Sequence, residues 1–405
     1  MKQIKSLLDS SKETLNIYVC GPTVYDHVHI GNLRPMIIFD VLTSVWKFLG
    51  KNINFLLNIT DIDDKIIQKA IKTKQNEEDV ANFYFQNYLE VLKIYNISYP
   101  TKIWKVTEKL NEIIDYISLL KKQGFTYENR DGDLMFSIDK LPNYGTVSGQ
   151  NLSKLLSKEA QDKDFVLWKK TKIGVAYDSP FGKGRPGWHT ECCAMIWSYF
   201  GDSIDIHGGG VDLIFPHHEN ENAQHYALFS KEITKHWLRV GSLTKNGQKM
   251  SKSLGNFILA KDFAQKHDPD VLRNFFLSSS FQSPVDIKDD VLENNKKVIK
   301  NYKISFYNFL TQNLKPNDEV VKEILKNFAY LNFSIGNSLI SKALRQKDHG
   351  SLAVVFKKLG FKFATRSLSE QDKLDYQMWK EFYEKGDYEN SDKLREKLWK
   401  KFIFS

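Results

Sequence analysis

Cysteine is scarce in this sequence, and long apolar runs are missing from it. The 405 residues contain three cysteines, Cys20, Cys192 and Cys193, an odd number that argues against a disulfide framework. No secretory leader stands at the N-terminus, and no stretch reaches the roughly 18 apolar residues that a membrane span needs. We therefore expect a protein of a reducing compartment, the cytoplasm, with no membrane contact.

The composition that is present favours large globular domains. Hydrophobic residues make up 41% of the chain and aromatic residues 13%, and a length of 405 residues predicts two or three domains. The formal net charge of +9 favours a polyanionic partner. A genome biased in base composition also enriches Lys, Asn and Ile, so the charge supports that inference only in part.

The first sixty residues predict the opening of a doubly wound α/β fold. Leu15–Val19 and Ile53–Ile59 are short apolar runs typical of buried strands, and a helical pattern lies between them at about residues 33–49. This order predicts a parallel, Rossmann-like sheet, whose ligands bind at the carboxyl ends of the strands. The polar side chains expected there are Cys20, His29 and Thr60.

The middle of the chain predicts an insertion into this sheet. Residues 65–125 have a charged helical pattern, and residues 126–180 are rich in turns. We predict an inserted subdomain over about residues 85–180, within a nucleotide-binding catalytic domain over residues 1–259.

Beyond this domain the pattern becomes helical. Residues 260–290 are expected to form a connecting stem module. Residues 291–405 carry lysine-rich amphipathic helices, which predict an all-α C-terminal domain.

Two short motifs, about two hundred residues apart, predict an ATP site. His29-Ile30-Gly31-Asn32 follows the first strand, and Lys249-Met250-Ser251-Lys252-Ser253 stands far downstream. Lys249 and Lys252 would neutralise phosphate charge in the transition state, while His29 and Asn32 at a helix N-terminus hold the other side of the nucleotide. The alternative for the second motif is a solvated surface turn.

A third motif predicts a metal site. His217 and Glu221 stand four residues apart, so on a helix their side chains share one face. With Cys20 and Cys192 they would form a tetrahedral site for one zinc ion, which accepts mixed sulfur, nitrogen and oxygen ligands. A His/Glu pair at this spacing is also a common coincidence. Cys193 is expected to be a small buried side chain, since one of two adjacent cysteines reaches the ion.

Longer segments between Ile17 and Asp286 carry a family signature. They are Tyr18-Val19-Cys20-Gly21-Pro22-Thr23-Val24-Tyr25-Asp26, Asn58-Ile59-Thr60-Asp61-Ile62-Asp63-Asp64-Lys65, Asp164-Phe165-Val166-Leu167-Trp168-Lys169, Gly184-Arg185-Pro186-Gly187-Trp188-His189-Thr190-Glu191-Cys192, Asp205-Ile206-His207-Gly208-Gly209-Gly210 and Phe215-Pro216-His217-His218-Glu219-Asn220-Glu221. Together with the two ATP motifs, they resemble the cysteinyl-tRNA synthetases, a family of class I aminoacyl-tRNA synthetases. Matched residue by residue, the zinc ligands of that family fall on Cys20, Cys192, His217 and Glu221, and its ATP-binding lysine falls on Lys252.

The resemblance implies a cysteine–tRNA ligase. L-Cysteine would react with ATP, bound with Mg²⁺, to give cysteinyl-adenylate, and the terminal ribose hydroxyl of tRNA(Cys) would then accept the cysteine. Zinc would bind the substrate thiolate and so reject serine, whose hydroxyl is a poor ligand. Residues 291–405 would bind the tRNA, including its anticodon, and we expect a monomer.

The same resemblance assigns further pocket residues. Thr60 and Trp188 would line the cysteine side chain, and either Asp61 or Asp205 would neutralise the substrate ammonium. Gly209, in the run Gly208-Gly209-Gly210, would let adenosine approach the backbone, although a tight turn explains the run equally. Three histidines are either pocket residues or packed side chains: His189, His207 and His218.

The sequence also departs from the family pattern. Asn32 stands where class I enzymes generally have histidine, although asparagine can still donate a hydrogen bond. Trp237-Leu238-Arg239-Val240-Gly241 replaces the usual Trp-Met-His-Asn and puts a minor substrate contact in doubt. The link from Leu155 to Asp164 is short, and the chain ends soon after Asp392-Lys393-Leu394-Arg395, where family members usually continue.

Two other functions remain as alternatives. A cysteine ligase that joins cysteine to an amino sugar resembles these synthetases, but the lysine-rich helical tail counts against it. A tRNA-binding protein without catalytic activity would need neither zinc ligands nor ATP motifs, and this chain has both.

Overall fold

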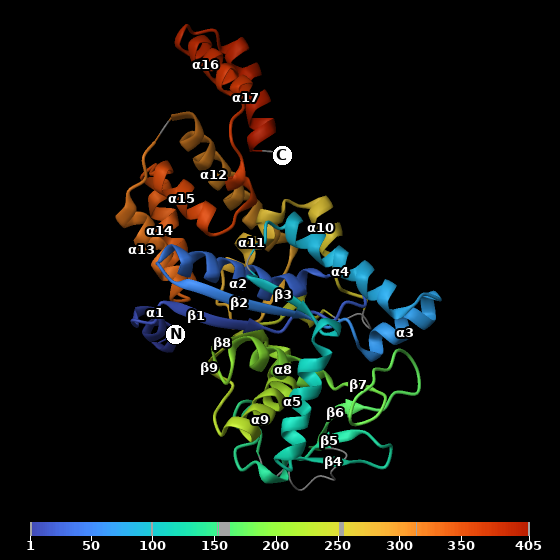
Figure 1. The fold of residues 1–405 in the computed structure, drawn as a ribbon. Helices are drawn as coiled ribbons and strands as arrows, with labels where there is room; N and C mark the ends of the chain where they lie inside the picture. Colours follow the sequence, from blue (N-terminus) through green and yellow to red (C-terminus); the bar gives the residue numbers. More distant parts are fainter. Residues whose placement is uncertain are drawn as a thin grey trace.

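A five-stranded parallel sheet forms the centre of the computed structural model, which describes residues 2–98, 100–151, 153, 163–250, 255–312 and 314–403 (Figure 1). Its strands are β1 (Thr14–Val19), β2 (Asn52–Ile59), β3 (Lys102–Lys105), β8 (Ile204–Gly210) and β9 (Thr234–Val240). They lie in the order β3-β2-β1-β8-β9 with every neighbouring pair parallel. The predicted doubly wound sheet is therefore confirmed, and its switch point lies between β1 and β8.

Helices cover both faces of this sheet, which explains why β1 and β2 read as nearly continuous apolar runs. On one face lie α2 (Ile30–Phe48) and α4 (Glu77–Ile94), with α3 (Asp64–Thr73) leading into α4 (Figure 1). On the other face lie α5 (Leu110–Lys122), α8 (Trp188–Phe200) and α9 (Glu219–Phe229).

A smaller antiparallel sheet lies between β3 and α8 in the sequence. Its strands are β4 (Thr126–Glu128), β5 (Leu134–Phe136), β6 (Phe165–Lys169) and β7 (Arg185–Pro186), with η1 (Thr107–Lys109) and η2 (Ile138–Lys140) as short connecting helices. The insertion starts later than the predicted residue 85, which falls inside α4, because β3 pairs with β2 in the main sheet. The helical interpretation of residues 65–125 overlooked β3, a four-residue edge strand with a lysine at each end. The short link from Leu155 lies almost wholly outside the described residues.

A three-stranded sheet and two helices follow β9. Here β10 (Leu243–Lys245) pairs with β11 (Gln248–Lys249) and with β12 (Val285–Ile287). In the sequence, α10 (Ala260–Lys266) and α11 (Pro269–Leu277) stand between β11 and β12. The predicted connecting module thus contains α10, α11 and the strand β12.

The C-terminal region is all-helical, as the pattern predicts. It comprises α12 (Asp289–Gln312), α13 (Asp318–Ala329), α14 (Phe333–Arg345), α15 (His349–Lys358), η5 (Lys362–Thr365), α16 (Glu370–Glu384) and α17 (Tyr388–Phe402). Helices α13 and α15 pack against α2, so their apolar residues join the core of the main sheet.

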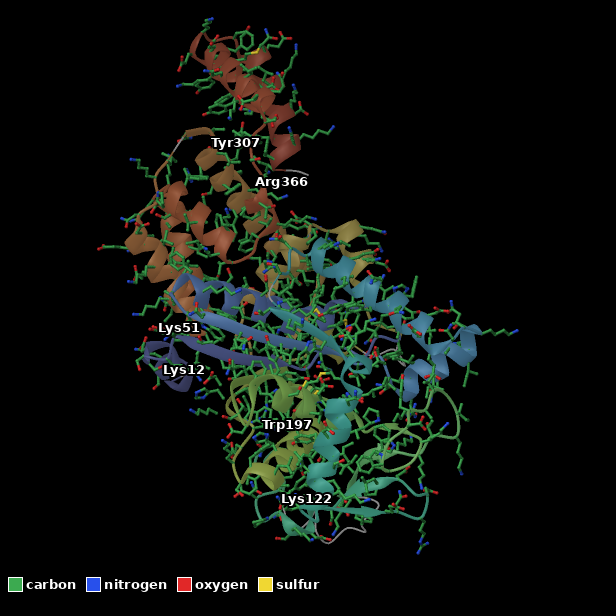
Figure 2. All side chains as sticks on the ribbon, in the orientation of Figure 1. Lys12, Lys51, Lys122, Trp197, Tyr307 and Arg366 are labelled. Atoms are coloured by element: carbon green, nitrogen blue, oxygen red, sulfur yellow. The ribbon has the colours of Figure 1, made fainter. Side chains whose placement is uncertain are left out.

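The last two helices form a hairpin that is attached more sparingly. A separate small cluster of buried residues joins it to α12: Tyr307, Leu398, Phe402 and Ile403. Arg366, just before the hairpin, donates hydrogen bonds to the carbonyls of Lys401 and Phe402, at 3.0 and 3.5 Å (Figure 2).

The N-terminal helix α1 (Lys2–Asp9) lies beside the amino-terminal ends of the strands. Lys51 donates to the carbonyls of Ser10 and Lys12, and Lys12 pairs with Asp205 at 2.6 Å (Figure 2). None of the helices that the structure describes is both long and apolar enough to cross a membrane.

Candidate active site

A cavity of about 400 Å³ opens where β1 and β8 end, at the switch point of the sheet. It is lined by residues of both sequence motifs and of the first segment after β1, among them Cys20, Thr23, Asp26, His29, Asn32, Trp188, Gly210, Asp212 and Met250. The expected ligand position at the carboxyl ends of the strands therefore coincides with a real cavity.

The first ATP motif forms the start of α2 and one wall of this cavity. His29 is the N-cap: its Nδ1 accepts a hydrogen bond from the Gly31 amide at 3.1 Å, and Asn32 Oδ1 accepts one from the His29 amide at 3.2 Å. Because Nδ1 accepts, the neutral imidazole carries its proton on Nε2. A Cβ on Gly31 would approach the His29 ring to 3.0 Å, so this position favours glycine.

The second ATP motif begins in the β10–β11 hairpin. Lys249 is the last residue of β11, Met250 is buried in the cavity wall, and Lys252 lies outside the described residues. Only the backbone of Lys249 is described.

Arg34 on α2 connects this helix to the region that leads to the second motif, a contact that was not predicted. Its guanidinium is fully buried and donates to the carbonyl oxygens of Ser242, Ser280 and Ser283 at 2.8–3.0 Å. The helix that begins at His29 is thereby attached to the base of the hairpin that leads to Lys249.

The glycine run at the end of β8 is placed differently from the prediction. Gly210 lines the cavity, whereas a Cβ on Gly209 would meet His218 and Leu213 at 3.0 Å. A Cβ on Gly208 would overlap the Phe39 ring at 2.2 Å. Close packing therefore explains Gly208 and Gly209, and Gly210 is the glycine of this run that lines the cavity.

The four predicted metal ligands form one buried cluster. Cys20 follows β1, Cys192 lies on α8, His217 lies in η4 (Ile214–His218) and Glu221 lies in the first turn of α9. Cys20 Sγ is 3.9 Å from Cys192 Sγ, 3.4 Å from His217 Nε2 and 3.4 Å from Glu221 Oε1. His217 Nε2 is 3.6 Å from Cys192 Sγ and 3.2 Å from Glu221 Oε1.

These distances suit a tetrahedral zinc ion. Bonds of about 2.3 Å to sulfur and about 2.0–2.1 Å to nitrogen put two sulfurs about 3.8 Å apart and a sulfur about 3.6 Å from a nitrogen. The described residues also offer the set Cys20, His207, His218 and Glu221. That set fits less well, because Cys20 Sγ is 4.0 Å from His218 Nε2 and His207 Nε2 is only 2.9 Å from Glu221 Oε2.

The buried charges shift the pKa values within the cluster in opposite directions. Burial and the neighbouring Cys192 raise the pKa of the Cys20 thiol well above its usual value. Burial opposes the charged form of Glu221, but His207 and His217 outweigh it and hold the pKa of this carboxyl well below its usual range. Burial likewise opposes the charged form of His217, yet Glu221 and Cys192 raise its pKa to about 10. The two thiols and the carboxylate of the cluster have few cationic neighbours to stabilise their negative charge. A divalent cation bound among them would supply the missing positive charge.

The other predicted histidines surround the cluster. His189 Nδ1 is 2.9 Å from His217 Nδ1, and burial together with His217 lowers the pKa of His189 to about 3, so His189 is neutral. His207 lies at an ion-pair distance from Glu221 but off the line of a hydrogen bond. Trp237, in the segment that departs from the family pattern, stacks on His207 with ring centroids 4.6 Å apart. Such outer contacts orient metal ligands.

The predicted cysteine-pocket residues are only partly brought together. Trp188 is 41% exposed, lines the cavity and stacks on His217 with ring centroids 4.2 Å apart. Thr60 is buried behind the wall, where its hydroxyl donates to Glu191 at 3.1 Å. Cys193 is buried and directs its thiol to the carbonyls of His189 and Glu221, as a packed cysteine does.

Neither aspartate predicted for the substrate ammonium lines the cavity. Asp205 lies near the start of β8, where it pairs with Lys12, and Asp61 accepts two hydrogen bonds from Thr107. The carboxylates that do line the cavity are Asp26 and Asp212. Asp212 stands two residues after the glycine run, a position at the end of a strand that would have identified it.

The chain is similar to known proteins in sequence and in fold. A profile of the class I (C) tRNA synthetase catalytic domain matches residues 7–297. A cysteine–tRNA ligase of Mesomycoplasma hyopneumoniae strain 232 is 47% identical over 97% of this chain and 98% of its own length. One of Mesoplasma florum is 39% identical over 97% of both chains. The fold matches that of Mycobacterium tuberculosis methionyl-tRNA synthetase in complex with methionyl-adenylate, with a TM-score of 0.65, 13% identity, and coverage of 90% of this chain and 93% of that one. The chain therefore belongs to the cysteinyl branch of the class I aminoacyl-tRNA synthetases, which are ATP-dependent ligases.

Proposed function

We propose that this chain is a cysteine–tRNA ligase that acts as a cytoplasmic monomer. The carboxylate of L-cysteine attacks the α-phosphorus of ATP, bound with Mg²⁺, and pyrophosphate leaves. The terminal ribose hydroxyl of tRNA(Cys) then attacks the activated carbonyl, and AMP leaves. Relatives with the name cysteine–tRNA ligase, matched over nearly their whole length, support this assignment.

One observation carries the choice of amino acid: Cys20 belongs both to the buried Cys₂-His-Glu cluster and to the wall of the nucleotide cavity. A substrate in that cavity reaches the cluster from the side of Cys20. A zinc ion held by Cys20, Cys192, His217 and Glu221 would accept the cysteine sulfur as a thiolate and not a serine hydroxyl. Discrimination by pocket shape alone would be only about 10–200-fold for so small a difference.

The groups around the cavity have distinct proposed tasks. His29 uses Nδ1 for the helix cap, so its Nε2–H is the group that donates a hydrogen bond to an ATP phosphate. Asn32 keeps the cap in place by accepting a hydrogen bond from the His29 amide. Lys249 and Lys252 close over the triphosphate, with charge placed where it builds in the transition state. Trp188 covers the cysteine side chain, and Asp212 or Asp26 takes its ammonium.

The domains follow from these tasks. We assign residues 1–259 to the catalytic domain and residues 260–290 to a stem. Residues 291–405 bind the tRNA, and the hairpin α16–α17, which stands apart from the main sheet in Figure 1, is the part that reads the anticodon.

Cysteine-dependent ATP–pyrophosphate exchange tests this function. We expect exchange with cysteine, little exchange with serine, loss of activity after zinc chelation and recovery when zinc is restored. Charging of tRNA(Cys), compared with an amino-sugar acceptor, then identifies the second substrate. Absence of exchange from the zinc-loaded protein would refute the proposal and leave a tRNA-binding protein without catalysis.

A further inference from the structure

A second cavity, of about 260 Å³, lies next to the first. Trp188 lines both, so the two cavities meet at this side chain. The second cavity is bounded by β6 and β7 of the inserted sheet and by the segment that follows β2 (Figure 1). None of the tasks assigned to the first cavity uses it.

A buried guanidinium nitrogen without a hydrogen-bond partner among the described residues marks this second cavity as a binding site. The side chain of Arg185 is 6% exposed, lines the cavity, and pairs through Nη2 with Asp64. Its Nη1 is buried and has no hydrogen-bond partner among the described residues. Buried donors are nearly always satisfied, and a charged one left alone is costly, so this N–H calls for an acceptor oxygen on a ligand.

The charges of the cavity restrict the kind of ligand. Two cations, Lys169 and Arg185, share its walls with Asp63, Asp64 and Glu191. Both cations already form ion pairs with Asp64: Lys169 Nζ is 2.9 Å from Asp64 Oδ2, and Arg185 pairs with Asp64 Oδ1. A free polyphosphate would therefore be poorly neutralised here. Trp188, which is exposed, adds an indole ring that suits the stacking of a nucleobase from a single strand, whereas Phe165 is buried and stacked on Phe136.

We infer that this cavity receives the 3′-terminal nucleotide of the tRNA, with Arg185 Nη1 donating to one of its oxygens. The inference rests on the proposed function, in which ATP and cysteine occupy the first cavity and a ribose hydroxyl must reach the activated carbonyl from beside it. A site on the other side of Trp188 places that nucleotide next to the reacting carbonyl without overlap with ATP. Arg185 is then a binding residue for the transfer step and has no part in activation.

Separate measurement of the two steps tests this. In Arg185→Gln we expect single-turnover transfer from preformed cysteinyl-adenylate to tRNA(Cys) to fall about tenfold or more beyond any change in ATP–pyrophosphate exchange. Lys183→Met removes an exposed cation (76% exposed) two residues away and should alter neither step. Asp64→Asn removes the ion pair but keeps Nη1, so its transfer defect should be smaller than that of Arg185→Gln. Equal losses of exchange and transfer, or an equal defect in Asp64→Asn, would overturn the inference.

A shortened tRNA gives an independent readout. Arg185→Gln should bind full-length tRNA(Cys) more weakly than the unsubstituted protein does, and the two proteins should bind equally a transcript that lacks its last nucleotide. A difference that persists with the short transcript would place Arg185 elsewhere on the tRNA path and refute the site. Failure of exchange in the unsubstituted protein would instead refute the proposed function itself.

Discussion

The metal cluster and the nucleotide cavity lie side by side, yet they are built in opposite ways. Three of the four cluster ligands are at most 1% exposed, and two of them contact further histidines: His217 contacts His189, and Glu221 contacts His207. The wall of the cavity combines the α2 cap with residues from the β10–β11 hairpin, and several of these residues are half-buried. In the proposed function, recognition of the amino acid would therefore depend on buried groups, whereas the nucleotide would be held by half-buried residues at the ends of several elements. We therefore expect substitutions in the cluster to abolish cysteine-dependent exchange almost completely, and substitutions in the cavity to reduce it by graded amounts.

Loss of a cluster ligand should have the largest effect. Cys192→Ser should lower cysteine-dependent exchange by more than about a hundredfold, because a hydroxyl is a poor zinc ligand. Metal content, measured by mass spectrometry, should fall with it. Cys193→Ser changes the adjacent buried thiol, which lies outside the four-residue cluster, and should retain the metal. Equal metal loss in both variants would contradict the assigned ligands.

Substitution of the cap should come next. His29→Asn keeps an N-capping side chain but loses the imidazole proton on Nε2. The exchange rate should fall by about 10²-fold, as when one donor to a developing charge is removed, with melting temperature and metal content unchanged. A parallel loss of thermal stability would show that His29 serves mainly the helix.

Removal of the zinc ion should change the melting temperature more than addition of ATP does. Chelation leaves buried thiols, imidazole and carboxylate without a cation, so the melting temperature should fall by roughly 5–10 °C and recover with zinc. ATP with Mg²⁺ should raise it by less, since the cavity residues are already solvated. A larger shift with ATP would reverse the comparison.

The smallest effect is expected for Asn32→His. The His29 amide donates to Asn32 Oδ1, and a histidine Nδ1 can accept the same hydrogen bond. Exchange should change by less than about threefold, measured at saturating cysteine with ATP varied. A tenfold loss would mean that Asn32 itself contacts the nucleotide in a way that imidazole does not reproduce.

The sequence was sufficient for the type of sheet and for its first two strands, and it named the four residues that the structure brings together in the metal cluster; the reasons are physical. Apolar runs bounded by Gly21 and Pro22 locate β1, and α2 begins where a capping histidine stands. It was insufficient wherever direction along a strand mattered. Asp205 lies at the amino-terminal end of β8, five residues before the strand ends at Gly210. Alternation along the same strand turns Gly209 from the cavity, whereas Gly210 lines it.

Long-range pairing was also beyond reach from sequence alone. β3 depends on its neighbour β2, because Lys-Ile-Trp-Lys has no strong strand pattern of its own. Likewise, the sequence could not show that Arg185 Nη1 lacks a hydrogen-bond partner, because this follows from the packing of the inserted sheet against the segment after β2.

Arg34 has a consequence for how such a protein tolerates mutation. Its guanidinium binds carbonyl oxygens at positions 242, 280 and 283, and every amino acid supplies a carbonyl. The side chains at those three positions can therefore change during evolution without loss of the hydrogen bonds to Arg34, provided that the backbone conformation there is kept. The attachment is encoded by one side chain, so in related sequences a single invariant arginine should accompany partners that vary freely.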